Sequence, residues 1–345
     1  MVWRARRQFG FVLATTAVVG FGVTCGGNHA ASAIGSRVTG AYPSVQELRR
    51  PFSGRSVWNT PVPDSARPTK SSRRLVAGLA SQVRRFGATI CTTAYSTPVY
   101  RVGRTQPIVR VRLDRTVYPG TSPYALEKAF RRVPIPPDAR PAAGTDGHMV
   151  VWQQSTDTMW EFWRARLVRG HWYASWGGRI RHLSTNPGYY DGRFHDWGAT
   201  ATSLPLLGGL MMEPELQHDH INHALAMAVP VVTARRVVWP AQRSDGGSHA
   251  RSSIPEGTRF RIRPDVDLES LHLNPPALAI AEAAQRYGMI VRDGGASVAF
   301  YAEAPKAGQA NPYAERHGPF QGLAPWQIVS QFPWDDLQVV RSPTS

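Results

Sequence analysis

Cysteine, lysine and acidic side chains are all scarce in this chain of 345 residues, which has two cysteines and 24 Asp and Glu against 40 Lys and Arg. Cys25 falls in a predicted leader, so Cys91 would be the only thiol of the processed chain, too few to hold a metal cluster by thiolates. Long apolar runs are missing beyond the first 33 residues, which excludes an integral membrane bundle. Because the chain holds 11 Trp, 11 Tyr and 12 Phe, we expect it to fold around a core.

The first 33 residues have the pattern of an export signal. A basic start that includes Arg6 and Arg7 precedes the apolar run 9–23, and small residues lead to a predicted cleavage after Ala33. The paired arginines fit the twin-arginine route, and the general secretory route is an equal alternative. A third and weaker alternative is acylation of Cys25 as a lipoprotein anchor. We therefore expect an extracellular, secreted protein without integral membrane association.

The positive charge is concentrated just after this leader. Residues 34–145 carry 19 basic against 5 acidic side chains, a net of +14, whereas residues 146–345 are close to neutral. In an exported protein such a region fits an acidic polymer or a lipid surface better than nucleic acid, and a generic solvated surface is an equal alternative. We expect a polysaccharide or cell-wall glycan as partner, no nucleic acid, and a monomeric protein.

Hydrophobic spacing predicts helices over residues 72–86, 122–132 and 276–287. Short runs rich in aromatic and β-branched side chains predict strands at 108–113, 149–152, 159–163, 171–176, 231–239, 258–262, 289–291 and 297–301. Residues 213–229 fit either a helix or a turn that leads into a strand. Because the strands follow one another instead of alternating with helices, we expect a mainly β fold, an antiparallel β-sandwich or jelly-roll-like core with a few peripheral helices.

A proline-rich stretch at 134–147 coincides with the change in charge and divides the chain. We expect 1–33 to be the export signal, 34–145 to be a basic N-terminal segment that packs on the core, and 146–345 to be the β-rich core region. The last two are expected to form one continuous globular domain.

Tryptophan is unusually dense in the middle of the chain, at positions 152, 160, 163, 172, 176 and 197. Strand alternation places Glu161 and Trp163 on one face and Trp160 and Phe162 on the other. If Trp160 and Phe162 face the core, Glu161 is presented to solvent beside a flat indole. Indole rings stack on sugars and carboxylates bond their hydroxyls, so the pattern suits a glycan cleft. An equal alternative is that the tryptophans fill the core.

This interpretation gives a set of expected site residues. The expected substrate-binding residues are Asp146, His148, Trp152, Gln153, Trp163 and Trp197. Glycoside hydrolysis needs two carboxyl groups, for which we expect Glu161 and Glu215, with His223 assisting. A helix-start role for Glu215 and a hydrogen-bonded core position for His223 are the stronger alternatives for those two residues.

Three further features, a run of histidines, an aspartate and a cysteine, are candidates for chemistry. His218, His220 and His223 lie close in sequence but do not have an established zinc spacing, so we expect no metal and no other cofactor. Asp293 is interpreted first as part of a hairpin turn and only second as a candidate acid. Cys91 lies in a strand-like run and is expected to be a buried structural residue.

Four motifs together resemble a family of uncharacterised secreted bacterial proteins that are common in actinobacteria. The motifs are Trp160-Glu161-Phe162-Trp163, His223-Ala224-Leu225, Val238-Trp239-Pro240-Ala241 and Tyr287-Gly288-Met289-Ile290-Val291 with Asp293. The resemblance covers roughly residues 140–340 and implies secretion and a shared architecture, but no activity. Gly294 replaces the Asn that often follows the aspartate in that family, which weakens Asp293 as a site residue.

The features together predict a secreted glycan-active protein, with a glycoside hydrolase acting on an extracellular or cell-wall polysaccharide as the first hypothesis. A non-catalytic β-sandwich that binds carbohydrate is the second. A polysaccharide lyase would use His223 as base and arginine to neutralise a uronate, and a purely structural envelope protein is the remaining alternative.

Overall fold

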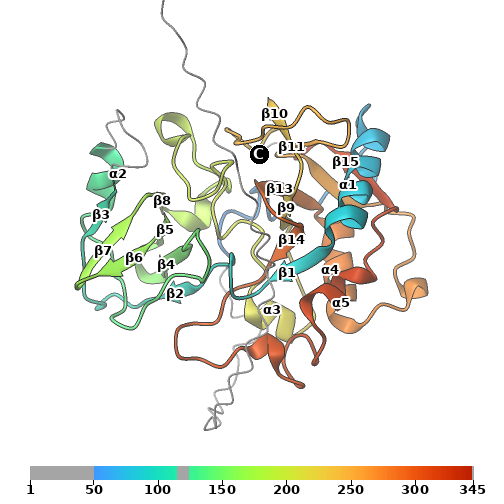
Figure 1. The fold of residues 1–345 in the computed structure, drawn as a ribbon. Helices are drawn as coiled ribbons and strands as arrows, with labels where there is room; N and C mark the ends of the chain where they lie inside the picture. Colours follow the sequence, from blue (N-terminus) through green and yellow to red (C-terminus); the bar gives the residue numbers. More distant parts are fainter. Residues whose placement is uncertain (1–49, 115–123, 344–345) are drawn as a thin grey trace, which may run out of the picture.

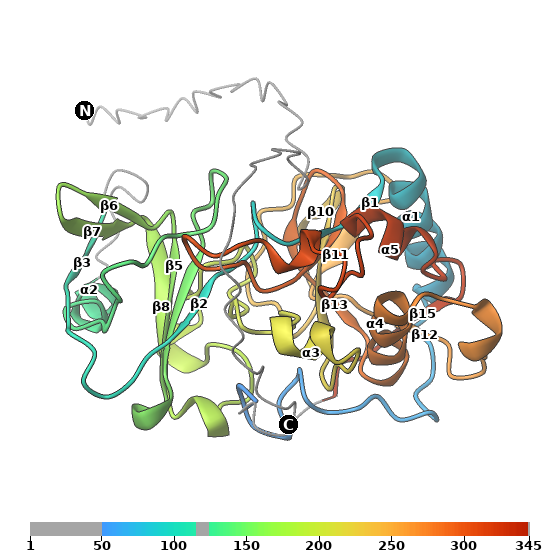
Figure 2. The same ribbon diagram turned by 90° about the horizontal axis from the view of Figure 1, so that it is seen from below.

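The computed structural model describes residues 50–114 and 124–343. Within them the chain forms two lobes that lie side by side, and both are built mainly from strands (Figures 1 and 2). The predicted export signal and the start of the helix expected over 122–132 lie outside the described residues.

A six-stranded mixed sheet forms the centre of the larger lobe. Its strands are ordered β1 (Ala88–Cys91), β14 (Val298–Tyr301), β9 (Leu225–Val229), β13 (Met289–Gly294), β12 (Arg259–Ile262) and β15 (Leu337–Val340). The pairs β1–β14 and β9–β13 are parallel, and the other three are antiparallel. A strand that ends at Cys91 is therefore hydrogen-bonded to one that ends at Tyr301, which joins distant parts of the sequence.

Helices cover one face of this sheet. They are α1 (Ser72–Phe86), α4 (Pro275–Arg286) and α5 (Pro325–Ser330). The apolar side of α1 buries Leu75 and Leu79 in a core cluster that also contains Met227 and Phe300 from the sheet. Helix α4 begins at Asn274, whose side chain accepts a hydrogen bond from the Ala277 amide, an N-cap.

The smaller lobe contains two further sheets and a short helix. The four-stranded sheet is ordered β2 (Val99–Arg101), β4 (Met149–Gln153), β5 (Thr158–Trp163) and β8 (Trp176–Arg181). The three-stranded sheet is ordered β3 (Val111–Leu113), β7 (His171–Ala174) and β6 (Arg166–Val168), and α2 (Tyr124–Ala129) packs against β8 and β3. Elsewhere β10 (Val232–Val237) pairs with β11 (Ile254–Glu256), and α3 (Glu213–Gln217) precedes β9.

The second face of the six-stranded sheet meets the smaller lobe. A separate core cluster joins Ala226, Ala228 and Ala299 of the sheet to the tryptophans and phenylalanines of the four-stranded sheet. Ala226, Ala228 and Ala299 have small side chains, and a cavity lies at the junction of the lobes beside Ala228 and Ala299.

The mainly β composition and the few helices agree with the sequence prediction. The helices expected over 72–86 and 276–287 are found as α1 and α4, and the ambiguous segment 213–229 divides into α3 and β9. The expected antiparallel arrangement holds only in part, because parallel pairs occur in all four sheets. Among the described residues, no helix combines the length and the apolar character needed to cross a bilayer.

Candidate functional site

The cavity at the junction of the lobes has a volume of about 210 Å³ and collects titratable side chains from both of them. It is lined by Cys91, Tyr95, Asp146, His148, Ala228, Asp293, Gly294, Gly295, Ala296, Ser297, Ala299 and Tyr301. Asp146 and His148 come from the turn just before β4, and Asp293 and Tyr301 come from the six-stranded sheet. Residues more than 140 positions apart in the sequence therefore line the same cavity.

Asp146 and His148 are fixed by the backbone around them. The carbonyl of Asp146 accepts a hydrogen bond from the Arg164 amide at 2.7 Å, and Gly147 at φ 46° turns the chain between the two side chains. A Cβ on Gly147 would lie 3.1 Å from the Ala165 carbonyl oxygen. The indole N–H of Trp163 donates to Asp146 Oδ1 at 3.2 Å. This carboxyl is therefore oriented on the cavity wall before any ligand arrives.

His148 is a buried imidazole, 4% exposed. Burial lowers its pKa to about 4, although Asp146 and a hydrogen bond with the backbone of Ala199 act in the opposite direction. The positive charge of Arg292 adds to the lowering. The ring is thus neutral near pH 7 and offers one donor and one acceptor nitrogen.

Asp293 reaches the cavity because of a β-bulge. The register between β13 and β9 shifts after Val291, so that Asp293 stands beside Ala228. Without the bulge, alternation would have put Asp293 on the same face as Val291, against the helices. Burial raises the pKa of Asp293 well above its usual value; Arg292 lowers it, and Asp245, Glu256 and Asp146 raise it further. Asp293 therefore holds its proton more firmly than an ordinary aspartate does.

Arg292, the residue before Asp293, lies beneath the cavity and is fully buried. Its Nη1 donates to the carbonyls of Leu206 at 2.8 Å and Gly208 at 3.0 Å, and its guanidinium lies 4.3 Å from the centre of the Tyr301 ring. Burial raises the pKa of Tyr301, so this hydroxyl stays protonated. Arg292 does not line the cavity and acts on it through charge.

The prediction that Glu161 faces solvent is wrong, because its side chain is completely buried. Alternation does separate it from Trp160 and Phe162, whose side chains contact α2 and its C-terminal neighbour Phe130. The opposite face of β5 is covered by a loop whose amides at Ala199 and Leu206 donate to the Glu161 carboxylate at 2.9 and 2.7 Å. Burial raises the pKa of Glu161 to about 7, against these two hydrogen bonds.

Glu215 and Glu161 do not form the expected carboxyl pair at the cavity, because neither lines it and each bonds its own separate partners. Glu215 Oε2 accepts the Met212 amide at 2.8 Å at the start of α3, the helix-start role considered from the sequence. The same oxygen lies 3.1 Å from His223 Nε2, and His223 Nδ1 bonds the Ala224 carbonyl.

Both nitrogens of His223 are thus engaged away from the cavity. Burial lowers the pKa of His223, but the Glu215 carboxylate outweighs this and leaves the pKa raised. The arrangement is the hydrogen-bonded core histidine that was the stronger sequence interpretation, and it leaves no nitrogen available as the base of a lyase.

The aromatic and amide residues expected to bind substrate lie elsewhere. Trp152 and Trp197 are 4% and 5% exposed and belong to the core between the lobes. Gln153 donates to the Gly103 carbonyl at 2.9 Å. Trp163 is partly buried and carries the Arg164 guanidinium 4.6 Å above its ring. Only Trp163 touches the site, through Asp146.

The histidine-rich segment does not form one cluster. His218 Nδ1 bonds the Pro214 carbonyl at 2.7 Å, and His220 Nε2 lies 2.6 Å from the Asn222 amide nitrogen. Within residues 50–114 and 124–343 there is no group of three or more His, Cys, Asp or Glu side chains arranged to hold a metal ion.

Comparison of the chain with known family models, with curated proteins and with solved structures gives no match. The resemblance to secreted actinobacterial proteins stays a prediction. In the cavity, a carboxyl whose pKa is raised, a second carboxyl held by an indole N–H, and a neutral imidazole face the same space. Such a set can donate a proton, accept one and orient a polar substrate.

Proposed function

We propose that the protein is a glycan-active hydrolase whose chemistry takes place in the cavity of Asp146, His148 and Asp293. The observation that carries this proposal is that two carboxyl groups from different lobes line one small cavity, with Asp293 favouring its protonated form. A carboxyl that favours its protonated form can act as the general acid of a glycosidase, and the second carboxyl is then available for the other role.

In this proposal Asp293 is the general acid and Asp146 is its carboxylate partner. Asp293 gives its proton to the oxygen of the glycosidic bond as the bond from that oxygen to the anomeric carbon breaks. A water oxygen then bonds to the anomeric carbon, and the Asp146 carboxylate takes the proton that this water loses. The neutral His148 ring hydrogen-bonds a sugar hydroxyl, and Tyr95 and Tyr301 supply aromatic walls.

The cavity favours an uncharged sugar over a uronate. Two of the lining side chains, Asp146 and Asp293, are carboxyls, and Asp245 and Glu256 add to the negative field that acts on Asp293. The nearby cation, Arg292, is buried behind Tyr301 and bonded to Leu206 and Gly208, so it is not placed to neutralise a substrate carboxylate. These features support hydrolysis over elimination.

The small volume of the cavity also limits the size of the substrate. Pockets for drug-sized ligands usually have about 300–1,000 Å³, so a cavity of about 210 Å³ suits a single ring of a glycan and not a long segment. Together with the predicted export signal, this suggests removal of terminal sugars from an extracellular or cell-wall polysaccharide.

The proposal is tested by incubating the secreted form with a panel of neutral and acidic polysaccharides and nitrophenyl glycosides. Released reducing ends report hydrolysis, and absorbance of unsaturated uronates reports elimination. Asp293→Asn and Asp146→Asn are each expected to reduce hydrolysis by about 100-fold or more. The exposed Asp335→Asn is the matched control and should keep full activity.

Two outcomes contradict this assignment. Hydrolysis that survives both cavity substitutions would place the chemistry elsewhere. Binding of a glycan without any product, in a protein whose cavity residues are intact, would favour the alternative of a non-catalytic carbohydrate-binding protein.

A further inference from the structure

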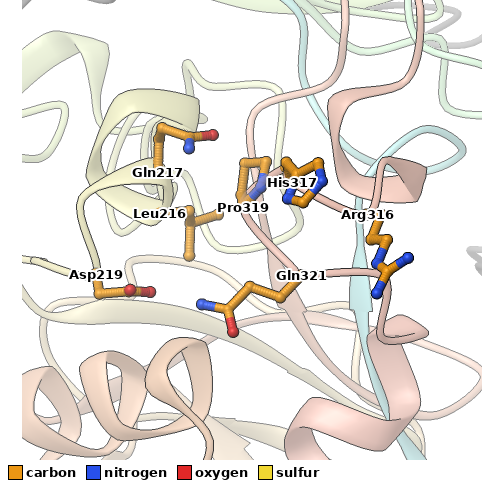
Figure 3. A pocket seen from close by; sticks show the side chains of 8 residues that line it. Leu216, Gln217, Asp219, Arg316, His317, Pro319 and Gln321 are labelled. Atoms are coloured by element: carbon orange, nitrogen blue, oxygen red, sulfur yellow. The ribbon is translucent and has the colours of Figure 1, made fainter.

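A second and larger cavity, of about 410 Å³, lies between α3 and the turn that precedes α5, and it shares no residue with the first. Figure 3 shows its walls: Gln217 and Asp219 come from the end of α3 and the turn after it, and Arg316, His317 and Gln321 come from the other segment. The side chain of Leu216 forms part of the floor.

The acidic side of this cavity has an unsatisfied acceptor. Asp219 Oδ1 is shielded from solvent and accepts no hydrogen bond from any described residue. Burial raises the pKa of Asp219, and the neighbouring His218 lowers it. A shielded carboxylate oxygen without a donor costs free energy that a ligand N–H would recover.

Asp219 is also held in place by its backbone. It has φ 48°, in the left-handed region, and its amide donates to the Leu216 carbonyl at 3.4 Å. An aspartate tolerates this conformation better than a bulky residue. The carboxylate is therefore positioned by the turn and not by a side-chain partner.

The opposite side of the cavity is cationic. Arg316 lies across from Asp219 in Figure 3, with Gln321 between them, and His317 is beside it. Among the residues that the structure describes, Arg316 has no hydrogen bond or ion pair with protein, although guanidinium groups pair readily with carboxylates. Gln217 and Gln321 add amide donors and acceptors to the lining of the cavity.

We propose that this cavity binds a small dipolar ligand, an amino acid or the end of a short peptide, with its ammonium group at Asp219 and its carboxylate at Arg316. A simple cation would leave Arg316 unpaired, and a simple anion would leave Asp219 unpaired. A neutral sugar would use the two glutamines but neither charge. Only a ligand with both charges satisfies the two walls together.

The test uses the secreted form and measures binding by calorimetry with four probes: alanine, dialanine, acetate and ethylammonium. Alanine or dialanine should bind, and the two singly charged probes should bind at least about tenfold more weakly because each satisfies one wall. Asp219→Asn and Arg316→Gln should each weaken binding of the dipolar probe by a similar factor. Asp335→Asn and Arg236→Gln, on exposed residues elsewhere, are the matched controls.

Arg316 is exposed and Asp219 is partly buried, and thermal unfolding shows whether the variants remain folded. Failure of alanine and dialanine to bind would overturn the proposal, as would binding that is unchanged in both variants or equal for acetate. These outcomes do not depend on hydrolytic activity in the first cavity, so the two proposals fail independently.

Discussion

Glu161 is connected to His148 through a single residue, Ala199. The Ala199 amide donates to Glu161 Oε1 at 2.9 Å, and the backbone of the same residue bonds the His148 ring. The second oxygen of Glu161 accepts the Leu206 amide at 2.7 Å, and the Leu206 carbonyl accepts Arg292 Nη1 at 2.8 Å. Glu161 therefore fixes one loop that supports both His148 and Arg292. It is a positioning residue for the cavity and not one of its walls.

Replacing Glu161 with Gln should destabilise the fold. A glutamine has one carbonyl oxygen, so its NH₂ group must face one of the two backbone N–H donors that the carboxylate satisfies. We expect a loss of about 1–3 kcal/mol in the free energy of unfolding, measured by urea denaturation at pH 8, above the raised pKa of Glu161. Glu282→Gln, on the exposed side of α4, is the control and should change stability little. Equal stability of the two variants would contradict the role given to Glu161.

Stability should decrease as the pH rises from about 4.5 to 7. Burial raises the pKa of Glu161 and of Glu256 to about 7 from an ordinary value of 4.5. Between these pH values the folded state keeps protons that the unfolded chain has lost, so each group disfavours folding by up to roughly 3 kcal/mol once the pH exceeds 7. Melting temperatures between pH 5 and pH 8 test this. A higher melting temperature at pH 8 in His148→Gln, which lacks the opposing titration of His148, would show that these carboxyls ionise without cost.

His148 acts in the opposite direction. Its pKa falls from 6.5 to about 4 on folding. Between these pH values the unfolded chain binds a proton at this ring and the folded chain does not. Acidification from pH 6.5 to pH 4 therefore removes stability. His148→Gln abolishes this titration while keeping an amide for Ala199. Each protein is compared with its own stability at pH 7. On acidification from there, the variant should gain more stability than the unmodified protein does. Identical pH slopes for the two proteins would show that His148 is not buried in its neutral form.

The same residues show how far sequence reasoning reaches. Spacing and capping located α1 and α4, because local patterns determine them. The turn 146–148 was singled out because it follows a long loop, and the structure places both side chains of that turn in the cavity. The sequence favours Asp293 first as a hairpin residue and only second as an acid, because a bulge in β13 is not visible in a period-two pattern.

The prediction that Glu161 faces solvent is wrong for a different reason. Alternation correctly separated its face of β5 from Trp160 and Phe162, but a sequence pattern shows only that a face is polar. It does not reveal a loop near residues 199–206 that covers that face and buries the carboxylate. Long-range contacts of this kind have no local signature.

Filling the cavity should separate the proposed activity from stability. Ala299 lines the cavity from the middle of β14, and valine is a good strand former, so Ala299→Val directs two additional methyl groups into the space while the strand is kept. We expect hydrolysis to fall by about tenfold or more, with a loss of stability of no more than about 1–3 kcal/mol. Ala234→Val on β10, away from the cavity, is the control. If Ala299→Val retains full activity at unchanged stability, the substrate does not enter this cavity, and the roles of Asp146 and Asp293 as partners in hydrolysis must be abandoned.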